Sequence, residues 1–137
     1  MRIINLIKIT QSLKNVFQNG RHFHATIALK GGNIIAIGHN DYRKEHPRNF
    51  YGRYFPKKGD VTSYRACLHS EISCLKQIQH RDDLHKITLV NIRIDNNGNL
   101  ANSEPCQNCK RVLGKYKFKK ILYTIDNQNI GRWINNV

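Results

Sequence analysis

The chain has 137 residues, which is the length of one ordinary domain and excludes a large multidomain enzyme. Lysine and arginine number 23 against 9 acidic residues, so the formal net charge is +14 and we expect an anionic partner. The hydrophobic fraction of 39% is too high for a disordered chain, and no apolar run approaches the roughly 18 to 20 residues that cross a bilayer. Residues 1–11 lack the pattern of a secretion signal, so we expect an intracellular, cytoplasmic protein without membrane contact.

The first predicted elements are a helix and a β-hairpin. Apolar residues recur on one helical face over residues 3–17, and Asn19-Gly20 supplies a stop signal just past the helix end. The runs 23–29 and 33–38 are short and rich in Ile, Ala and Thr, and Lys30-Gly31-Gly32 separates them. Because two glycines in so short a turn are typical of a tight hairpin connection, we predict that the two runs pair.

Residues 41–66 have no sustained helical or strand period and contain two prolines and two glycines, which predicts an ordered loop. Six of the twelve aromatic residues and seven basic residues lie in it, so the loop is too aromatic for disorder. We interpret it as a surface that stacks bases and neutralises phosphates, with a solvated surface holding a few core aromatics as the alternative.

Helices and strands alternate in the second half of the chain. The predicted elements are a helix over 67–79, a strand over 86–94 with a turn at 95–98, a helix over 106–115 and a strand over 119–125, followed by an unassigned tail over 126–137. This alternation predicts an α/β fold in which helices cover a sheet.

Two short motifs carry metal-ligand chemistry. His69 lies near the start of one predicted helix, and Cys106 and Cys109 open another. A C-x-x-C at a helix N-terminus places two sulfurs on one side of the first turn, where backbone N–H groups and the dipole favour thiolates. Zinc takes thiolate and imidazole ligands, and three protein ligands with one open position form a catalytic arrangement. We therefore predict a Zn²⁺ site formed by these three residues.

Glu71 follows the histidine by two positions and is not needed as a ligand. Zinc lowers the pKa of a bound water toward neutrality, and a neighbouring carboxylate can take its proton and return it to a leaving group. The pattern therefore predicts a hydrolase with Glu71 as the catalytic residue. A closed structural zinc site with Cys67 or His80 as the fourth ligand is the alternative, and Cys74 is expected to be a small buried residue.

The segments His69-Ser70-Glu71 and Pro105-Cys106-Gln107-Asn108-Cys109 resemble the H-x-E and P-C-x-x-C signature of the zinc-dependent cytidine and deoxycytidylate deaminase superfamily. The resemblance covers residues 23–125, with 41–66 as an insertion. It implies a single deaminase-like domain over 1–137, folded as a three-layer α-β-α sandwich with a central mixed sheet. It also implies self-association as a homo-oligomer.

The resemblance extends to the substrate pocket. Gly38-His39-Asn40 is similar to the family's G-x-N, which implies that Asn40 contacts the substrate; a turn-closing role is the alternative. The other candidate substrate contacts, all in the basic aromatic loop, are Arg43, Lys44, Tyr51, Arg53 and Tyr54.

Three features depart from the family pattern. Ser70 stands where the family most often has alanine. Residues 126–137 are too few for the full final helix and strand of larger members, and residues 41–66 enter the region from which the family shapes its substrate mouth.

We expect hydrolytic deamination of a nucleobase, with cytosine in a nucleotide such as CMP or dCMP as the substrate. An editing deaminase acting on tRNA, other RNA or single-stranded DNA is an alternative that the positive charge favours. The alternative of another class is a non-catalytic, zinc-containing module that binds nucleic acid. The signature itself does not name the base.

Overall fold

The computed structural model describes residues 2–17, 22–45 and 67–133, with only the backbone described for residues 17, 41–45, 67 and 68. In chain order the elements are α1 (Ile3–Phe17), β1 (Phe23–Lys30), β2 (Asn33–His39), β3 (Asp41–Glu45), β4 (Cys67–Leu68), α3 (Ser70–Ile78), the 3-10 helix Leu84–Lys86, β5 (Thr88–Ile94), β6 (Leu100–Ala101), α4 (Gln107–Leu113), β7 (Lys120–Thr124) and β8 (Ile130–Trp133).

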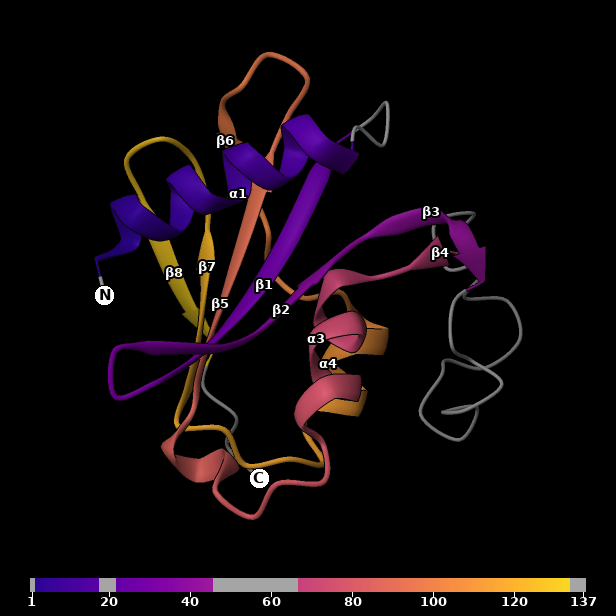
Figure 1. Ribbon diagram of the computed structural model, residues 1–137, viewed down its shortest axis with the longest axis vertical. Helices are drawn as coiled ribbons and strands as arrows, with labels where there is room; N and C mark the ends of the chain where they lie inside the picture. The colour runs from indigo at the N-terminus through magenta and orange to yellow at the C-terminus, as the bar shows by residue number, and fades with distance from the viewer. Residues whose placement is uncertain (1, 18–21, 46–66, 134–137) are drawn as a thin grey trace.

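A mixed sheet forms the centre of the molecule, with strands in the order β2-β1-β5-β7-β8 and with β6 paired to the end of β5. β5 and β7 run parallel, and the other pairings described in this sheet are antiparallel. Helix α1 lies across one face of the sheet, and α3 and α4 lie on the other (Figure 1). The predicted α/β class, a three-layer α-β-α sandwich around a central mixed sheet, is confirmed.

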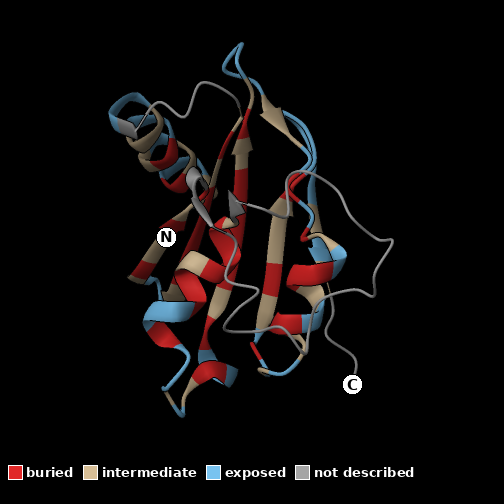
Figure 2. Ribbon diagram, turned by 90° about the vertical axis from the view of Figure 1, so that its right-hand side faces the viewer, coloured by how far each residue is buried: buried red, intermediate tan, exposed pale blue. Residues whose placement is uncertain are grey.

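Strands β1, β2, β5 and β7 contribute to two cores, because successive side chains point to opposite faces of the sheet. The core under α1 consists of Leu6, Ile27, Val90, Ile92 and Ile94. The core under α3 and α4 includes Ala28, Ala36, Ile72, Leu75, Leu89, Val112 and Ile121. Figure 2 shows the buried residues of the helices gathered on the sides that face the strands. The sheet therefore separates a core that holds α1 from a core that carries the two later helices.

The first helix and the hairpin form as predicted. Helix α1 covers residues 3–17, and β1 and β2 pair antiparallel. Gly31 and Gly32, which connect the two strands, have φ angles of 57° and 84°, in the left-handed region that glycine adopts without steric cost. Within the described residues, no helix combines the length and the apolar character that crossing a membrane requires.

The predicted loop is corrected at its start. Residues 41–45 form β3, which pairs antiparallel with β4 in a separate two-stranded sheet. The sequence of β3 is charged and lacks the alternating apolar residues by which a half-buried strand is predicted. A two-stranded sheet can form without them, because its strands are joined by backbone hydrogen bonds. The same pairing shortens the predicted helix 67–79, since residues 67 and 68 are extended and α3 begins at Ser70.

The last strands also differ from the predicted pattern. The turn at 95–98 leads into the short strand β6, and the tail contributes β8, which pairs antiparallel with β7 at the edge of the sheet. The Asp126 carboxylate accepts hydrogen bonds from the backbone N–H groups of Gln128 and Asn129, which closes the β7–β8 connection. Twelve residues are thus enough for an edge strand, which needs only a tight connection and one neighbour.

Candidate active site

The site lies where α3 and α4 begin, on the face of the sheet opposite α1 (Figure 1). His69 is the residue that precedes the first turn of α3, and Cys106 occupies the same position in α4. Both have extended backbone conformations, so each turns from an incoming segment into a helix. The two helix starts bring together residues that are 37 positions apart in the chain.

His69, Cys106 and Cys109 point their ligand atoms toward one another, with all three atoms within 4.8 Å. The Nδ1 atom of His69 lies 3.3 Å from the Cys109 sulfur and 3.5 Å from the Cys106 sulfur. A tetrahedral zinc, with bonds of about 2.3 Å to sulfur and about 2.0 Å to nitrogen, separates these atoms by about 3.5 Å. The three side chains therefore fit zinc in number, chemistry and spacing.

The two cysteines differ in their affinity for a proton. A hydrogen bond from Cys109, followed by contact with His69, lowers the pKa of Cys106 to about 4 although the side chain is partly buried. The same hydrogen bond and complete burial raise the pKa of Cys109 well above its usual range. Because the pKa of Cys109 is raised, a metal that binds here must displace a proton from this thiol.

Glu71 lies in the first turn of α3 and is only 5% exposed. Besides the hydrogen bond with Cys106 and burial, its carboxyl group raises the pKa of the Cys109 thiol, so it lies beside the ligand group without being a member of it. Burial raises the pKa of Glu71, while the positive charge of His69 opposes that rise. A carboxyl group with a raised pKa is suited to accept and return a proton near neutral pH.

A buried chain of polar side chains connects Glu71 to the centre of the sheet. The Ser70 hydroxyl donates to Oε1 of Glu71 at 3.0 Å, and Thr26 Oγ1 lies 2.9 Å from Ser70 Oγ. Thr26 Oγ1 also lies 2.8 Å from Oδ1 of Asn91, whose Nδ2 donates to the carbonyl oxygen of Ser103. One network therefore links the first turn of α3 with the segment that leads into α4.

Gly38 allows α3 to approach the sheet closely enough for these contacts. A Cβ atom at this position would lie 2.3 Å from the backbone nitrogen of Cys74 and 2.5 Å from the carbonyl oxygen of Ser70. Both atoms belong to the helix backbone, which cannot rotate away as a side chain would. The glycine of the G-x-N segment thus fixes the height of the helix that carries Glu71.

Comparison with protein families identifies the chain. Residues 5–125 match the model of the cytidine and deoxycytidylate deaminase zinc-binding region. The chain belongs to the cytidine and deoxycytidylate deaminase family. Searches of curated proteins and of solved structures give no match. The zinc predicted from the H-x-E and P-C-x-x-C motifs is the metal of this family, and the three side chains of the deaminase are positioned to hold it.

Asn40 lies at the end of β2 and is 4% exposed. Its Oδ1 accepts from the backbone N–H of His24 at 3.0 Å, and its Nδ2 donates to the carbonyl oxygen of His22 at 3.2 Å. These bonds extend the pairing of β1 with β2 by one residue and give Asn40 a structural role in the deaminase. Its contact with substrate stays a prediction.

The side chains of the other predicted substrate contacts are not described, so their contact with substrate stays a prediction. Arg43 and Lys44 lie on β3, where only the backbone is described, and Tyr51, Arg53 and Tyr54 lie outside the described residues.

A fourth protein ligand is not found among the residues whose side chains the structure describes. His80 lies past the C-terminal end of α3, at the opposite end of that helix from His69. Cys74 is fully buried, and this burial raises the pKa of its thiol to about 12. Cys67 lies on β4 without a described side chain. The described donor set therefore has three members, the number of protein ligands typical of a catalytic zinc site, while Cys67 as a fourth ligand stays untested.

The sequence analysis missed Thr26, Asn91 and Ser103. Thr26 and Asn91 each interrupt an apolar strand, and both are buried. A polar residue inside an apolar strand predicts a buried hydrogen bond, because leaving its polar atoms unpaired would be costly. The sequence therefore indicates that Thr26 and Asn91 form buried hydrogen bonds, but the sequence of one strand does not show which residue on another element is the partner.

Proposed function

We propose that the protein is a hydrolytic deaminase that converts cytosine in a free nucleotide, such as CMP or dCMP, to uracil. The observation that supports this most strongly is the position of Glu71, which is buried, accepts a hydrogen bond from Ser70 and lies beside a three-ligand zinc set. A structural zinc site has no use for a buried carboxyl group with a raised pKa at its edge.

The reaction replaces an amino group with oxygen from water and releases ammonia. His69, Cys106 and Cys109 would hold the zinc, which would lower the pKa of a bound water and so supply the nucleophile at neutral pH. Glu71 takes a proton from water and delivers it to the departing amine, and Ser70 holds one oxygen of that carboxylate in place. Burial of the carboxyl group keeps bulk water away from the proton that it carries.

The variant Glu71→Gln tests this role directly. It keeps the size and hydrogen-bonding capacity of the side chain but cannot carry the proton, so we expect turnover to fall by at least about 10²-fold to 10⁴-fold while zinc content is unchanged. Asp82→Asn, at an exposed carboxylate beyond α3, makes the same chemical change away from the site and should retain full activity. Near-normal rates in the Glu71 variant would exclude the proton-transfer role.

The substrate is tested with a panel of cytidine, CMP, dCMP, dCTP, adenosine and guanine compounds, single-stranded DNA and tRNA. Ammonia release and product mass are measured for the zinc-loaded protein and for the Glu71→Gln variant. Conversion of one free nucleotide supports the proposal. Zinc-loaded protein that binds nucleic acid and leaves every base unchanged would favour the non-catalytic module instead.

The net charge of +14 favours a second candidate, an editing deaminase that acts on a base within RNA or single-stranded DNA. Contacts with many phosphates release counterions, so activity on a polymer should fall steeply as salt is added. A single nucleotide contacts few cations, and its conversion should depend only weakly on salt. The slope of activity against salt concentration therefore separates the two candidates.

A further inference from the structure

Two cross-strand pairs lie in sequence along the face of β1 and β5 that carries the site. Thr26 is paired in register with Asn91, and the next pair on the same face is His24 with Arg93. The first pair contacts Ser70, which holds Glu71. Two residues along a strand span about 6.8 Å, so the second pair lies one short step from the support of Glu71.

This second pair lies beyond the starts of α3 and α4. Under these helices the strands contribute Ala28 of β1 and Leu89 of β5, which are toward the other end of the sheet. In Figure 1 the beginning of β1 and the end of β5 continue past both helices. Arg93 is therefore on the same side of the sheet as the zinc ligands and is not covered by the core that packs under α3 and α4.

Arg93 is a cation without a carboxylate partner among the described residues. Its Nη1 donates to the carbonyl oxygen of Asn102 at 3.3 Å, while its buried Nε has no acceptor. Asp95, the nearest carboxylate along the chain, accepts instead from the backbone N–H groups of Asn97 and Asn99, both at 2.9 Å.

His24 does not supply the missing negative charge. Burial, followed by the positive charges of Arg93 and His69, lowers the pKa of His24 to about 3, so the ring is neutral at physiological pH. Arg93 thus lies beside a neutral ring, and the one hydrogen bond described for its guanidinium goes to a carbonyl oxygen, so no described group neutralises its charge.

We propose that Arg93 binds the phosphate of the nucleotide whose base is deaminated. A guanidinium group matches phosphate oxygens with two parallel hydrogen bonds, and a partly buried guanidinium binds more strongly than an exposed lysine. A single half-buried cation suits the one phosphate of a free nucleotide, whereas a polymer needs a row of cations along its backbone. The inference rests on the proposed function, because it takes the bound molecule to be that enzyme's substrate.

A competing explanation gives Arg93 a purely structural role. Through Asn102 it would brace the segment that leads to Cys106, and its loss would then disturb the zinc site. Such a brace would affect all substrates equally. A phosphate contact affects only ligands that carry a phosphate, so cytidine and CMP together distinguish the two explanations.

Binding is measured first, by calorimetry on zinc-loaded Glu71→Gln protein with CMP and with cytidine. We expect CMP to bind at least about tenfold more tightly than cytidine, and we expect Arg93→Gln added to this background to remove that difference. Arg132→Gln, at an exposed cation of β8, changes the net charge equally and should preserve the preference. A preference that survives in the Arg93 variant, or parallel losses for both ligands with loss of zinc, would overturn the proposal.

Turnover is measured second, with Arg93→Gln in the otherwise unchanged protein. We expect kcat/KM for CMP to fall by about 10-fold to 100-fold, while kcat/KM for cytidine changes by less than about threefold. A defect confined to an oligonucleotide substrate would overturn the assignment to a free nucleotide. If the protein deaminates none of these compounds but the CMP preference depends on Arg93, the proposed reaction is wrong while the phosphate site stands.

Discussion

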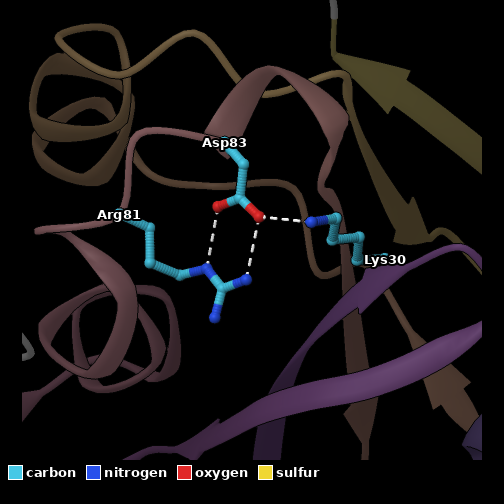
Figure 3. Close-up of polar contacts among 3 residues, drawn as sticks. All are labelled: Lys30, Arg81 and Asp83. Atoms are coloured by element: carbon cyan, nitrogen blue, oxygen red, sulfur yellow. Dashed lines mark hydrogen bonds and ion pairs between the residues drawn. The ribbon is translucent and has the colours of Figure 1, made fainter.

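The two ends of β1 hold positive charge in opposite ways. At its last residue, Lys30 donates to Asp83 at 2.6 Å, and the Nε and Nη2 atoms of Arg81 donate to the same carboxylate at 2.8 Å each (Figure 3). At the other end, Arg93 is paired with His24, and the hydrogen bond described for its side chain goes to the carbonyl oxygen of Asn102. At one end, Asp83 thus forms ion pairs with two cations. At the other end, Arg93 has no carboxylate partner among the described residues.

This difference separates the part of the molecule that maintains the fold from the part that acts on a ligand. The Asp83 cluster connects the hairpin to the segment between α3 and β5, far from the zinc ligands. The end near Arg93 combines two thiols, an imidazole and a carboxyl group whose burial disfavours its charged form. Such an arrangement costs stability, and proteins retain that cost where a metal or a substrate completes the site.

The largest expected effect comes from Cys109→Ser, which removes one of the three ligands at the active end. Because a serine hydroxyl is a poor zinc ligand, we expect zinc content to fall below one half per chain and activity to become undetectable. Metal analysis and the ammonia assay check both results. Cys74→Ala removes another buried thiol outside the ligand group, and it should retain zinc. Full zinc content in the Cys109 variant would mean that the metal is held elsewhere.

The next effect is expected from Gly38→Ala, which pushes α3 away from the sheet. The added Cβ meets helix backbone, so the helix start and Glu71 must move, and a shift of this kind can cost about 100-fold in rate. Gly98→Ala is the matched control: it strains a φ of 82° but meets nothing within 4 Å, and it lies in the β5–β6 turn. We expect both variants to lower Tm, and only the Gly38 variant to lower kcat substantially. Equal kcat values would show that the close approach of α3 is not required for catalysis.

The sequence was sufficient for the layers and for the metal ligands, because both follow from local patterns. Helix 3–17 has a sustained apolar period, and the spacing of Cys106 and Cys109 already places two sulfurs on one helical turn. The pairing of β3 with β4 could not be predicted, since the charged residues 41–45 lack strand periodicity and their partner is more than 20 residues away. A local pattern does not report a contact that only the folded chain creates.

The hydrogen bonds that hold Glu71, and the absence of a described carboxylate partner for Arg93, could not be predicted for the same reason. Thr26, Ser70 and Asn91 come from three separate elements, and only the register of β1 with β5 brings them together. Ser70 was seen in the sequence as a departure from the usual alanine, but its hydrogen bond to Glu71 is a property of the structure.

A smaller effect is expected from Ser70→Ala, which restores the residue most common in the family and removes the hydrogen bond to Glu71. The carboxylate then loses a fixed orientation, so we expect kcat to fall by about tenfold. KM and zinc content should not change, because the hydroxyl bonds to Thr26 and Glu71 and to no member of the ligand group. Steady-state kinetics with metal analysis separate these quantities. Unchanged kcat would show that Glu71 is positioned by its helix alone.

The smallest effect is expected from Asp83→Asn at the paired end. Hydrogen bonds from Arg81 and Lys30 hold the pKa of Asp83 well below its usual range, so the folded state favours the ionised carboxylate. Its contribution to stability is present above the unfolded-state pKa of about 3.9 and is lost as pH falls below that value. The Tm difference between wild type and Asp83→Asn should therefore be small at pH 7 and should shrink in acid and at high salt. Deaminase activity should not change in Asp83→Asn, whereas Arg93→Gln should change substrate preference with little effect on Tm. An altered activity in Asp83→Asn, or a lowered Tm with unchanged preference in Arg93→Gln, would contradict the division of roles between the two ends.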